Sequence, residues 1–334
     1  MSDPHAMAPV AFEAARKLVD RARIPGAVLG IVDSNGKRTV RHAGYAQLLP
    51  SKRTLQTDTW FDLASLTKVL FTTPGILQLH IDGIIDLDEP LTRLLPDLCQ
   101  YHTNGWQRRT TFRQCLGHQT HFPAVEPIYT YGTNPELLRA FVLQRQWQHV
   151  EPVYSDINFI LLGIALERQH GCRLHALDPG PGFAFSAAPE TSAATEHCTW
   201  RNQMICGEVH DENCYALQGS GHAGLFGTAT SVLDYAEALL TGSAHAPDLI
   251  DLMRSPLSAT RAHGWERAHS GWSGGDKCSS DTLGHTGFTG TGLWIDFAAG
   301  HAWTLLSNRV HPTRHCDSGI DQLRRSVGAT LYAA

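Results

Sequence analysis

The sequence predicts an α+β fold in which an antiparallel sheet flanked by helices is formed from both chain ends, with a mostly helical region inserted between them. Near the N-terminus, the apolar run at 27–32 predicts a buried strand, and the turn Asp33-Ser34-Asn35-Gly36 leads into a second strand at 38–45. Near the C-terminus, further strands are expected at 284–290, 292–297 and 302–307. Because strands at both ends enclose a helical middle, one sheet formed by the two termini is the simplest arrangement.

Helical patterns account for most of the remaining chain. A first helix at 9–23 ends before Ile24-Pro25-Gly26, and a long helical stretch covers 65–98, with a kink or break expected at Pro74. Further helices are expected at 135–146, 157–169, 230–240 and 318–334. The stretch 178–197 is rich in Pro, Gly, Ala and Ser, which predicts an irregular surface loop close to the substrate.

These elements divide the chain into a discontinuous sheet domain, residues 9–70 and 225–334, and a mostly helical domain, residues 71–224. With 42% hydrophobic and 18% charged residues, the 334-residue chain has the ordinary balance of a globular protein. Its 27 Lys and Arg residues and 32 Asp and Glu residues form no block of like charge. This balance argues against nucleic acid and membrane partners, and it favours a small neutral or weakly charged substrate.

Nothing in the sequence predicts an exported or a metal-binding protein. Charged residues interrupt the first thirty positions, so these contain no apolar segment like that of a signal peptide, and a cytoplasmic location is expected. The 8 cysteines include no C-x-x-C pair and are expected to be reduced. The 19 histidines show no H-E-x-x-H or clustered Cys and His spacing, so we expect no metal and no cofactor.

A serine and a lysine three residues apart, Ser65 and Lys68, stand at the start of the long helical stretch. On a helix, side chains three residues apart share a face, with their Cβ atoms about 5–6 Å apart. The Ser65 hydroxyl and the Lys68 ammonium can therefore meet without help from the rest of the fold. Since a serine hydroxyl is a weak nucleophile until a neighbouring group takes its proton, the pair predicts covalent catalysis.

Two further segments accompany this pair. Tyr154-Ser155-Asp156 precedes the helix expected at 157–169, and His285-Thr286-Gly287 lies on the first C-terminal strand. In this order and spacing, the three segments resemble the motifs of the serine β-lactamase and penicillin-binding protein superfamily. The likeness is greatest to class C β-lactamases, family VIII esterases and D-aminopeptidase-like hydrolases. It extends over nearly the whole chain through collinear segments at 82–90, 207–213, 221–226 and 284–290.

The resemblance implies catalytic roles for four side chains. Ser65 would be the acylated nucleophile, Lys68 its proton-transfer partner, and Tyr154 the general base that later protonates the leaving group. An ordinary tyrosine hydroxyl has a pKa of about 10, so a tyrosine base needs cationic neighbours. Lys68 and a protonated or hydrogen-bonding His285 could supply them.

The resemblance also implies where the substrate is held. The oxyanion hole would consist of the backbone N–H groups of Ser65 and Phe288. Asp156, Thr286 and Gly287 would contact the substrate. Because the Ser65 amide belongs to a helix N-terminus, the positive end of the helix dipole suits a developing oxyanion.

The chain departs from the family pattern at two of these positions. His285 stands where lactamases and D-Ala-D-Ala peptidases usually carry a lysine, and a histidine with a pKa of about 6.5 is mostly neutral at pH 7. Recognition of a carboxylated β-lactam should therefore be weaker, which favours esters or amides. Asp156 stands where class C enzymes usually have Asn, and an acid beside Lys68 would keep the ammonium charged. Lys68 would then act as an electrostatic partner, with Tyr154 as the base.

The sequence thus predicts a serine hydrolase that acts through a Ser65 acyl-enzyme on a small ester, amide or β-lactam. Two alternatives keep the same first step. One is an acyltransferase that passes the acyl group to an alcohol or amine, and the other is a penicillin-binding or sensor-like module that is acylated without turnover. His210-Asp211 and Gly221-His222 are expected to belong to a hydrogen-bonded scaffold. The oligomeric state stays open.

Overall fold

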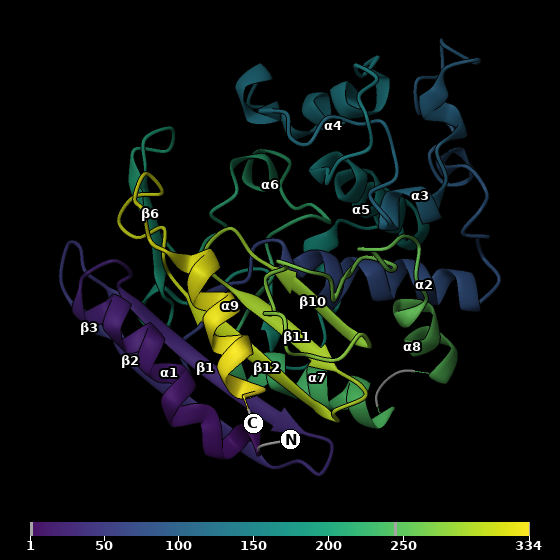
Figure 1. Cartoon of the computed structure of the whole chain (residues 1–334). Coiled ribbons are helices and arrows are strands. Elements are labelled where there is room, and N and C mark those ends of the chain that lie inside the picture. Colours follow the sequence, from purple (N-terminus) through teal and green to yellow (C-terminus); the bar gives the residue numbers. More distant parts are fainter. Residues whose placement is uncertain (1–2, 244–245, 334) are drawn as a thin grey trace.

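The computed structural model describes residues 3–243 and 246–333. Its central feature is a seven-stranded antiparallel sheet with the strand order β3-β2-β1-β12-β11-β10-β9 (Figure 1). The central pair joins the two ends of the chain, because β1 lies antiparallel to β12 with Ala27 opposite Ser307 and Asp33 opposite His301. Strands from both termini therefore form one sheet, and the predicted fold class is confirmed.

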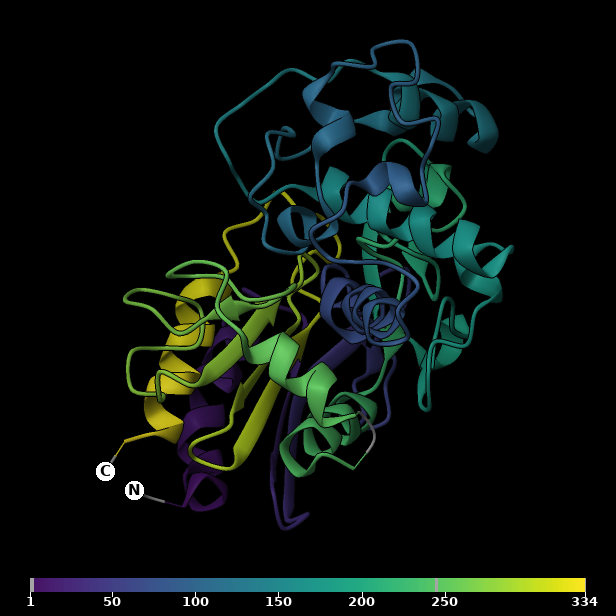
Figure 2. The same cartoon turned by 90° about the vertical axis from the view of Figure 1, so that its right-hand side faces the viewer.

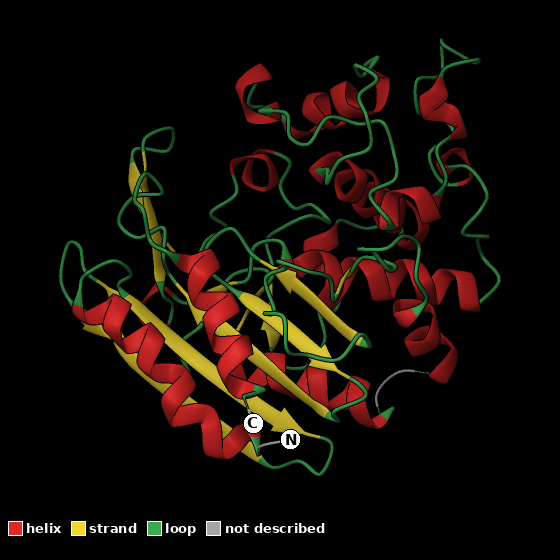
Figure 3. Ribbon diagram, in the orientation of Figure 1, coloured by secondary structure: helices red, strands yellow, loops and turns green. Residues whose placement is uncertain are grey.

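The strands, drawn yellow in Figure 3, form this sheet and two small ones. The large sheet contains β1 (Gly26–Asp33), β2 (Arg38–Gln47), β3 (Arg53–Thr54), β9 (Glu266–Arg267), β10 (Thr282–Thr286), β11 (Gly292–Asp296) and β12 (His301–Ser307). The small sheets contain β4 (Phe61–Asp62), β5 (Phe183–Ala184) and β8 (Phe226–Gly227) in one and β6 (Ala194–Cys198) and β7 (Gln203–Cys206) in the other.

The α-helices of the described residues cover the sheet and form the inserted region. They are α1 (Pro4–Asp20), α2 (Thr73–Ile81), α3 (Phe112–Leu116), α4 (Pro135–Gln144), α5 (Asp156–His170), α6 (Glu212–Ala216), α7 (Ala229–Thr241), α8 (Pro247–Arg254) and α9 (Ile320–Leu331). A π-helical turn, Lys68–Thr72, precedes α2 directly. None of the helices in residues 3–243 and 246–333 is both long and apolar enough to span a membrane.

The sheet is covered on both faces. Helices α1 and α9 pack against each other on one face, and α7 packs on β1 and β12 from the other face (Figure 2). Alternate side chains of β1 enter the two resulting cores: Leu29 and Ile31 lie with the helices α1 and α9, and Val28 lies on the side of α7. This double burial explains why β1 is a continuous apolar run.

Several predicted boundaries are corrected by the structure. The stretch 65–98 is helical only as far as Ile81, because the chain turns at Gly83, whose φ is +70°. The strand expected at 284–290 ends at Thr286, since Gly290 has a φ of +115° and belongs to a turn. The stretch 178–197 is mostly irregular, but it includes β5 and most of β6. The division into domains at residues 70 and 225 stays a prediction.

Candidate active site

Ser65 follows a backbone turn that is held in an unusual conformation. Ala64, immediately before it, has a φ of +48°, which non-glycine residues rarely adopt. The Asp62 carboxylate accepts a hydrogen bond from the Ala64 N–H (2.8 Å), and the Thr67 hydroxyl donates to the Ala64 carbonyl oxygen (2.6 Å). These contacts hold a conformation that costs about 1–3 kcal/mol, of the kind that concentrates at functional sites.

The predicted meeting of Ser65 and Lys68 is found in the structure. The Lys68 Nζ donates to Ser65 Oγ at 2.9 Å and to the His222 carbonyl oxygen at 3.1 Å. Lys68 lies in the π-helical turn, where the Thr73 N–H donates to the Lys68 carbonyl oxygen five residues earlier. The wider turn lies directly before Pro74, which has no N–H to donate, so the helix continues through the proline instead of breaking.

The Lys68 ammonium is completely buried and carries its charge. Burial alone would lower its pKa, but the Asp156 carboxylate and the neighbouring Tyr154 outweigh burial and raise it above the usual value. The ion pair with Asp156 Oδ1 is 2.9 Å long, and the ammonium lies 5.0 Å from the centre of the Tyr154 ring. The ammonium is therefore held in its charged form.

His285 lies close to Tyr154, with 5.9 Å between the ring centres. Burial and the nearby cations Lys68 and Arg261 lower its pKa well below the usual value, so the ring is neutral at pH 7. Its Nδ1 donates to the Thr286 carbonyl oxygen (3.0 Å), which leaves an unprotonated Nε2, buried and without a partner among the described residues. A protonated His285, one of the two forms expected, does not fit this environment.

The turn after β10 brings Phe288 beside the nucleophile. The hydroxyl of Thr289 donates to the Asp62 carbonyl oxygen (2.8 Å), and that of Thr291 donates to the Leu63 carbonyl oxygen (3.0 Å). Within residues 3–243 and 246–333, neither the Ser65 nor the Phe288 amide N–H donates a hydrogen bond. The two hydroxyl contacts thus hold the turn against the nucleophile segment. Each of these two segments offers one amide N–H that has no partner among the described residues.

A cavity of about 750 Å³ unites most of the predicted site. Ser65, Tyr154, Asp156, His285, Thr286 and Phe288 all line it. Gly287 does not, because its Cα faces the nucleophile segment, where an added Cβ would lie 2.6 Å from the Leu63 carbonyl oxygen. No residue of the stretch 178–197, all of which the structure describes, lines the cavity directly, but Glu196 at its end bonds to the lining residues His210 and Arg314.

The cavity also contains a cation that the sequence did not reveal. Arg261 lines it and stands 5.4 Å above the Tyr154 ring. Its guanidinium forms no ion pair within the described part of the chain, whereas Lys68 is paired with Asp156. Arg261 belongs to the segment before β9, which only the tertiary fold brings to Tyr154. No spacing or motif could have indicated it.

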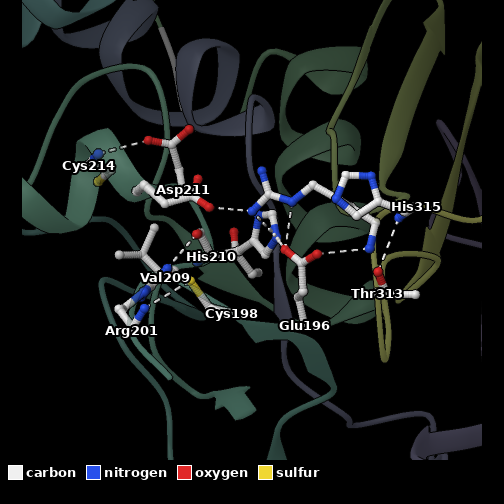
Figure 4. A network of polar contacts seen from close by, with 12 residues as sticks. Glu196, Cys198, Arg201, Val209, His210, Asp211, Cys214, Thr313 and His315 are labelled. Atoms are coloured by element: carbon white, nitrogen blue, oxygen red, sulfur yellow. Dashed lines mark hydrogen bonds and ion pairs between the residues drawn. The ribbon is translucent and has the colours of Figure 1, made fainter. Parts of the chain in front are cut away.

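Beside Phe288, the wall of the cavity contains His210 and Arg314. Both belong to a polar network with Glu196 (Figure 4). The His210 Nε2 lies 2.9 Å from Glu196 Oε2, and the Arg314 Nε donates to the same oxygen at 2.6 Å. Burial opposes the charge of Glu196, but the His210 and Arg314 contacts lower its pKa to about 2. The expected scaffold role of His210 agrees with these contacts, and its ring also stacks on Phe288 with 5.7 Å between ring centres.

A second part of this wall supports Lys68. The His222 Nε2 donates to Asp211 Oδ1 at 2.9 Å, and its Nδ1 lies 2.7 Å from Ser220 Oγ. Burial disfavours the charge of Asp211, but His222 and the Cys214 N–H hold the pKa of this carboxyl below its usual value. Because the His222 carbonyl oxygen accepts from Lys68, the network fixes one of the contacts of the ammonium.

Comparisons with known proteins bear on the family of this chain. A model of the Beta-lactamase family matches residues 12–324. An N-acetylmuramyl-L-alanine amidase of Bacillus subtilis (strain 168) is 30% identical over 87% of this chain and 78% of its own. A protein named "Putative D-alanyl-D-alanine carboxypeptidase", of Salmonella agona (strain SL483), is 28% identical over 76% of this chain and 70% of its own.

A solved structure shows the same fold. The crystal structure of a beta-lactamase from Sulfitobacter sp. EE-36 superposes with a TM-score of 0.73, at 19% identity, and covers 98% of both chains. At this identity the likeness bears on the fold alone. The match of the family model, in contrast, covers almost all of the sequence, including each of the three motifs. The chain therefore belongs to the beta-lactamase family of serine hydrolases.

Proposed function

We propose that the protein hydrolyses a small peptide-like amide or ester through an acyl-enzyme on Ser65. The observation that carries this proposal is the position of the Lys68 ammonium, which is 2.9 Å from both Ser65 Oγ and Asp156 Oδ1 and fully buried. A charged donor on Oγ stabilises the alkoxide that forms when the serine loses its proton.

Tyr154 is the base in this proposal, because the pKa of Lys68 is raised. The Tyr154 side-chain oxygen takes the Ser65 proton while Oγ attacks the substrate carbonyl carbon. The bond from that carbon to the leaving nitrogen or oxygen then breaks, and Tyr154 returns the proton to the leaving group. In the second half-reaction, water gives one proton to Tyr154 while its oxygen attacks the acyl carbon. The bond from that carbon to Oγ then breaks, and Tyr154 returns the proton to Oγ, which restores free Ser65 and releases the acid.

The oxyanion of each tetrahedral intermediate would lie between the amide N–H groups of Ser65 and Phe288. Both donors are without a partner among the described residues, which supports this role. The loss of one such donor typically costs about 100–1000-fold in rate.

The substrate class rests on two further observations. The amidase and the carboxypeptidase among the relatives are named for cleaving amides, which favours a peptide-like amide here. Arg261 adds an unpaired cation to the cavity, and a guanidinium binds a carboxylate with two parallel hydrogen bonds. We therefore propose a substrate with a carboxylate near the scissile bond. Arg261 would bind the substrate carboxylate in place of His285, which is neutral in this site.

A direct test combines turnover with mass spectrometry. Purified protein is offered nitrocefin, short-chain p-nitrophenyl esters and D-amino-acid p-nitroanilides, and Ser65→Ala is compared with the wild type. We expect multiple turnovers on an ester or anilide and a loss of at least about 1000-fold in kcat with Ser65→Ala. A Ser65 adduct that persists without turnover would instead indicate the sensor-like module. Equal activity of the two proteins would refute the mechanism.

A further inference from the structure

His118 lies against Tyr154, and its backbone has an unusual conformation that the three sequence motifs do not explain. It follows the short helix α3 and has a φ of +52°, in the left-handed region that side chains rarely adopt. The residue is buried, with only 5% of its surface exposed. A strained residue in a buried position beside an active site is a reason to ask what its side chain holds.

The contacts of His118 determine which ring nitrogen carries the hydrogen. The Ser155 N–H donates to its Nδ1 at 3.1 Å. The Thr120 hydroxyl donates to Asn158 Oδ1 (2.7 Å), so the Nδ2 of that amide faces His118 Nδ1 as a second donor, at 3.3 Å. Since both neighbours donate, Nδ1 is the acceptor and Nε2 carries the hydrogen.

The same ring covers the side chain of Tyr154. The two ring centres are 4.3 Å apart, with 32° between the ring planes. His118 therefore touches Tyr154 by its ring face and holds the next residue, Ser155, by its Nδ1. Phe159 also packs against the His118 ring, with 5.3 Å between the ring centres.

The electrostatic surroundings keep the His118 ring neutral. Burial and the nearby Arg261 and Lys68 lower the pKa of His118 well below its usual value, so the ring stays neutral and Nδ1 stays free to accept. The Nε2–H, in turn, is buried without a partner among the described residues. The ring thus keeps one form throughout the neutral pH range.

We propose that His118 is a positioning residue for Tyr154, holding the plane of its ring through the stacked contact and the start of its motif through the Ser155 N–H. This inference rests on the proposed function, in which Tyr154 moves the proton. A base must stay within hydrogen-bond reach of the proton that it takes, and a displacement of about 1 Å can cost on the order of 100-fold in rate. His118 acts through Tyr154 and does not itself touch the reacting atoms.

The test uses two substitutions that separate the two contacts. His118→Phe keeps a ring against Tyr154 but removes the acceptor for the Ser155 N–H. His118→Asn keeps an acceptor near the position of Nδ1 and tolerates the positive φ, but it removes the ring. His121→Phe is the matched control, since His121 lies three residues further on and stacks on His149 at 3.7 Å, away from Tyr154.

We expect His118→Phe to lower kcat by about 10–100-fold with KM changed less than about threefold. His118→Asn should retain at least about fivefold more activity than His118→Phe, and His121→Phe should stay within about twofold of the wild type. All assays are run well below the melting temperature of each variant. If His118→Phe keeps the wild-type kcat, or if both His118 variants lose only as much as His121→Phe, the positioning role is refuted.

The rate of acylation of Ser65 by a slow activated ester, followed by mass spectrometry, separates this inference from the proposed function. If wild-type Ser65 is never acylated, the proposed function fails. If wild type and His118→Phe are acylated at the same rate, only the positioning role of His118 fails. A slower acylation of His118→Phe, with partial recovery in His118→Asn, supports both.

Discussion

The Asp156 carboxylate lies 2.9 Å from the Lys68 ammonium, and the lysine side chain is fully buried while the aspartate is 22% exposed. The pKa of Lys68 is raised in the folded protein, although burial alone would lower it. A raised lysine pKa stabilises the fold at pH values below about 10.5, and this stabilisation is lost as the pH rises through the folded-state pKa.

Asp156→Asn is expected to lower the pKa of Lys68, because burial remains while the opposing charge is gone. If Tyr154 is the base and Lys68 must be charged, the alkaline limb of the kcat/KM profile should move to lower pH. The profile is measured from about pH 6 to about pH 10 on a p-nitrophenyl ester. If Lys68 were itself the base, the same substitution would raise the activity near neutral pH, because more of the amine would be unprotonated.

Glu196 provides a second pH-dependent prediction. Its pKa is about 2 in the fold, against 4.5 ordinarily, and its side chain is 6% exposed. A lowered carboxyl pKa stabilises the protein above about pH 4.5, and this contribution, on the order of 3 kcal/mol, is lost as the pH falls towards 2. Urea unfolding of Glu196→Gln should therefore show lower stability at pH 7 and a smaller further loss between about pH 5 and pH 3.

Glu190 supplies the control for this experiment, because it is exposed and, among the described residues, forms no hydrogen bond or ion pair with His210 or Arg314. Glu190→Gln should reproduce the wild-type dependence on pH. If Glu196→Gln follows the wild-type curve as well, the contacts in Figure 4 contribute no stability through the charge of Glu196.

The parts of the site that the sequence predicted are those that depend on local geometry. Ser65 and Lys68 meet because they are three residues apart on one helical turn, and Asp156 opens α5 two residues after Tyr154. The apolar runs and the turn residues likewise indicated the two ends of the sheet. These signals are carried by neighbouring residues and need no knowledge of the tertiary fold.

The parts of the site that the sequence did not predict depend on contacts between residues far apart in the sequence. Arg261 and His118 meet Tyr154 only in the folded chain, so no spacing pointed to them. The helix at 65–98 was predicted too long for a related reason. Ile85, Leu87, Leu91, Leu95 and Leu98 are all buried, but they lie in turns and in one short 3-10 segment, Leu91–Arg93, that together repeat the apolar pattern of a helix.

Arg261→Met should weaken binding of substrates that carry a carboxylate and leave neutral ones unaffected. The unpaired guanidinium lines the cavity next to Tyr154, so an anionic substrate group would lose its counter-charge. We expect KM for a carboxylated anilide to rise at least about tenfold, about 1.4 kcal/mol in binding free energy. A matched pair of substrates, the free acid and its amide, serves as the control. An equal change for both would contradict the proposed carboxylate contact.

Arg324 leads to the last prediction, because it holds the turn that carries Phe288. This buried side chain, on α9, donates through Nη2 to the carbonyl oxygens of Gly287 and Thr291, both at 2.8 Å. The two acceptors are the two ends of the turn, so Arg324 sets where the Phe288 N–H points. Burial lowers the pKa of Arg324 to about 10, which still leaves the guanidinium charged at neutral pH.

Arg324→Met should lower kcat by about 10–100-fold with little change in KM, because a displaced oxyanion donor is felt in the transition state more than in the bound substrate. Arg325→Met is the control, since Arg325 is the next residue of α9 and is exposed. Both variants are compared by steady-state kinetics and by thermal unfolding, as Arg324→Met also removes one of the two donors to each carbonyl oxygen and leaves only the backbone N–H groups of Gly290 and Gly287. A fall in stability with an unchanged kcat would mean that the turn keeps its shape without Arg324, and that the threonine contacts to the nucleophile segment suffice to hold it.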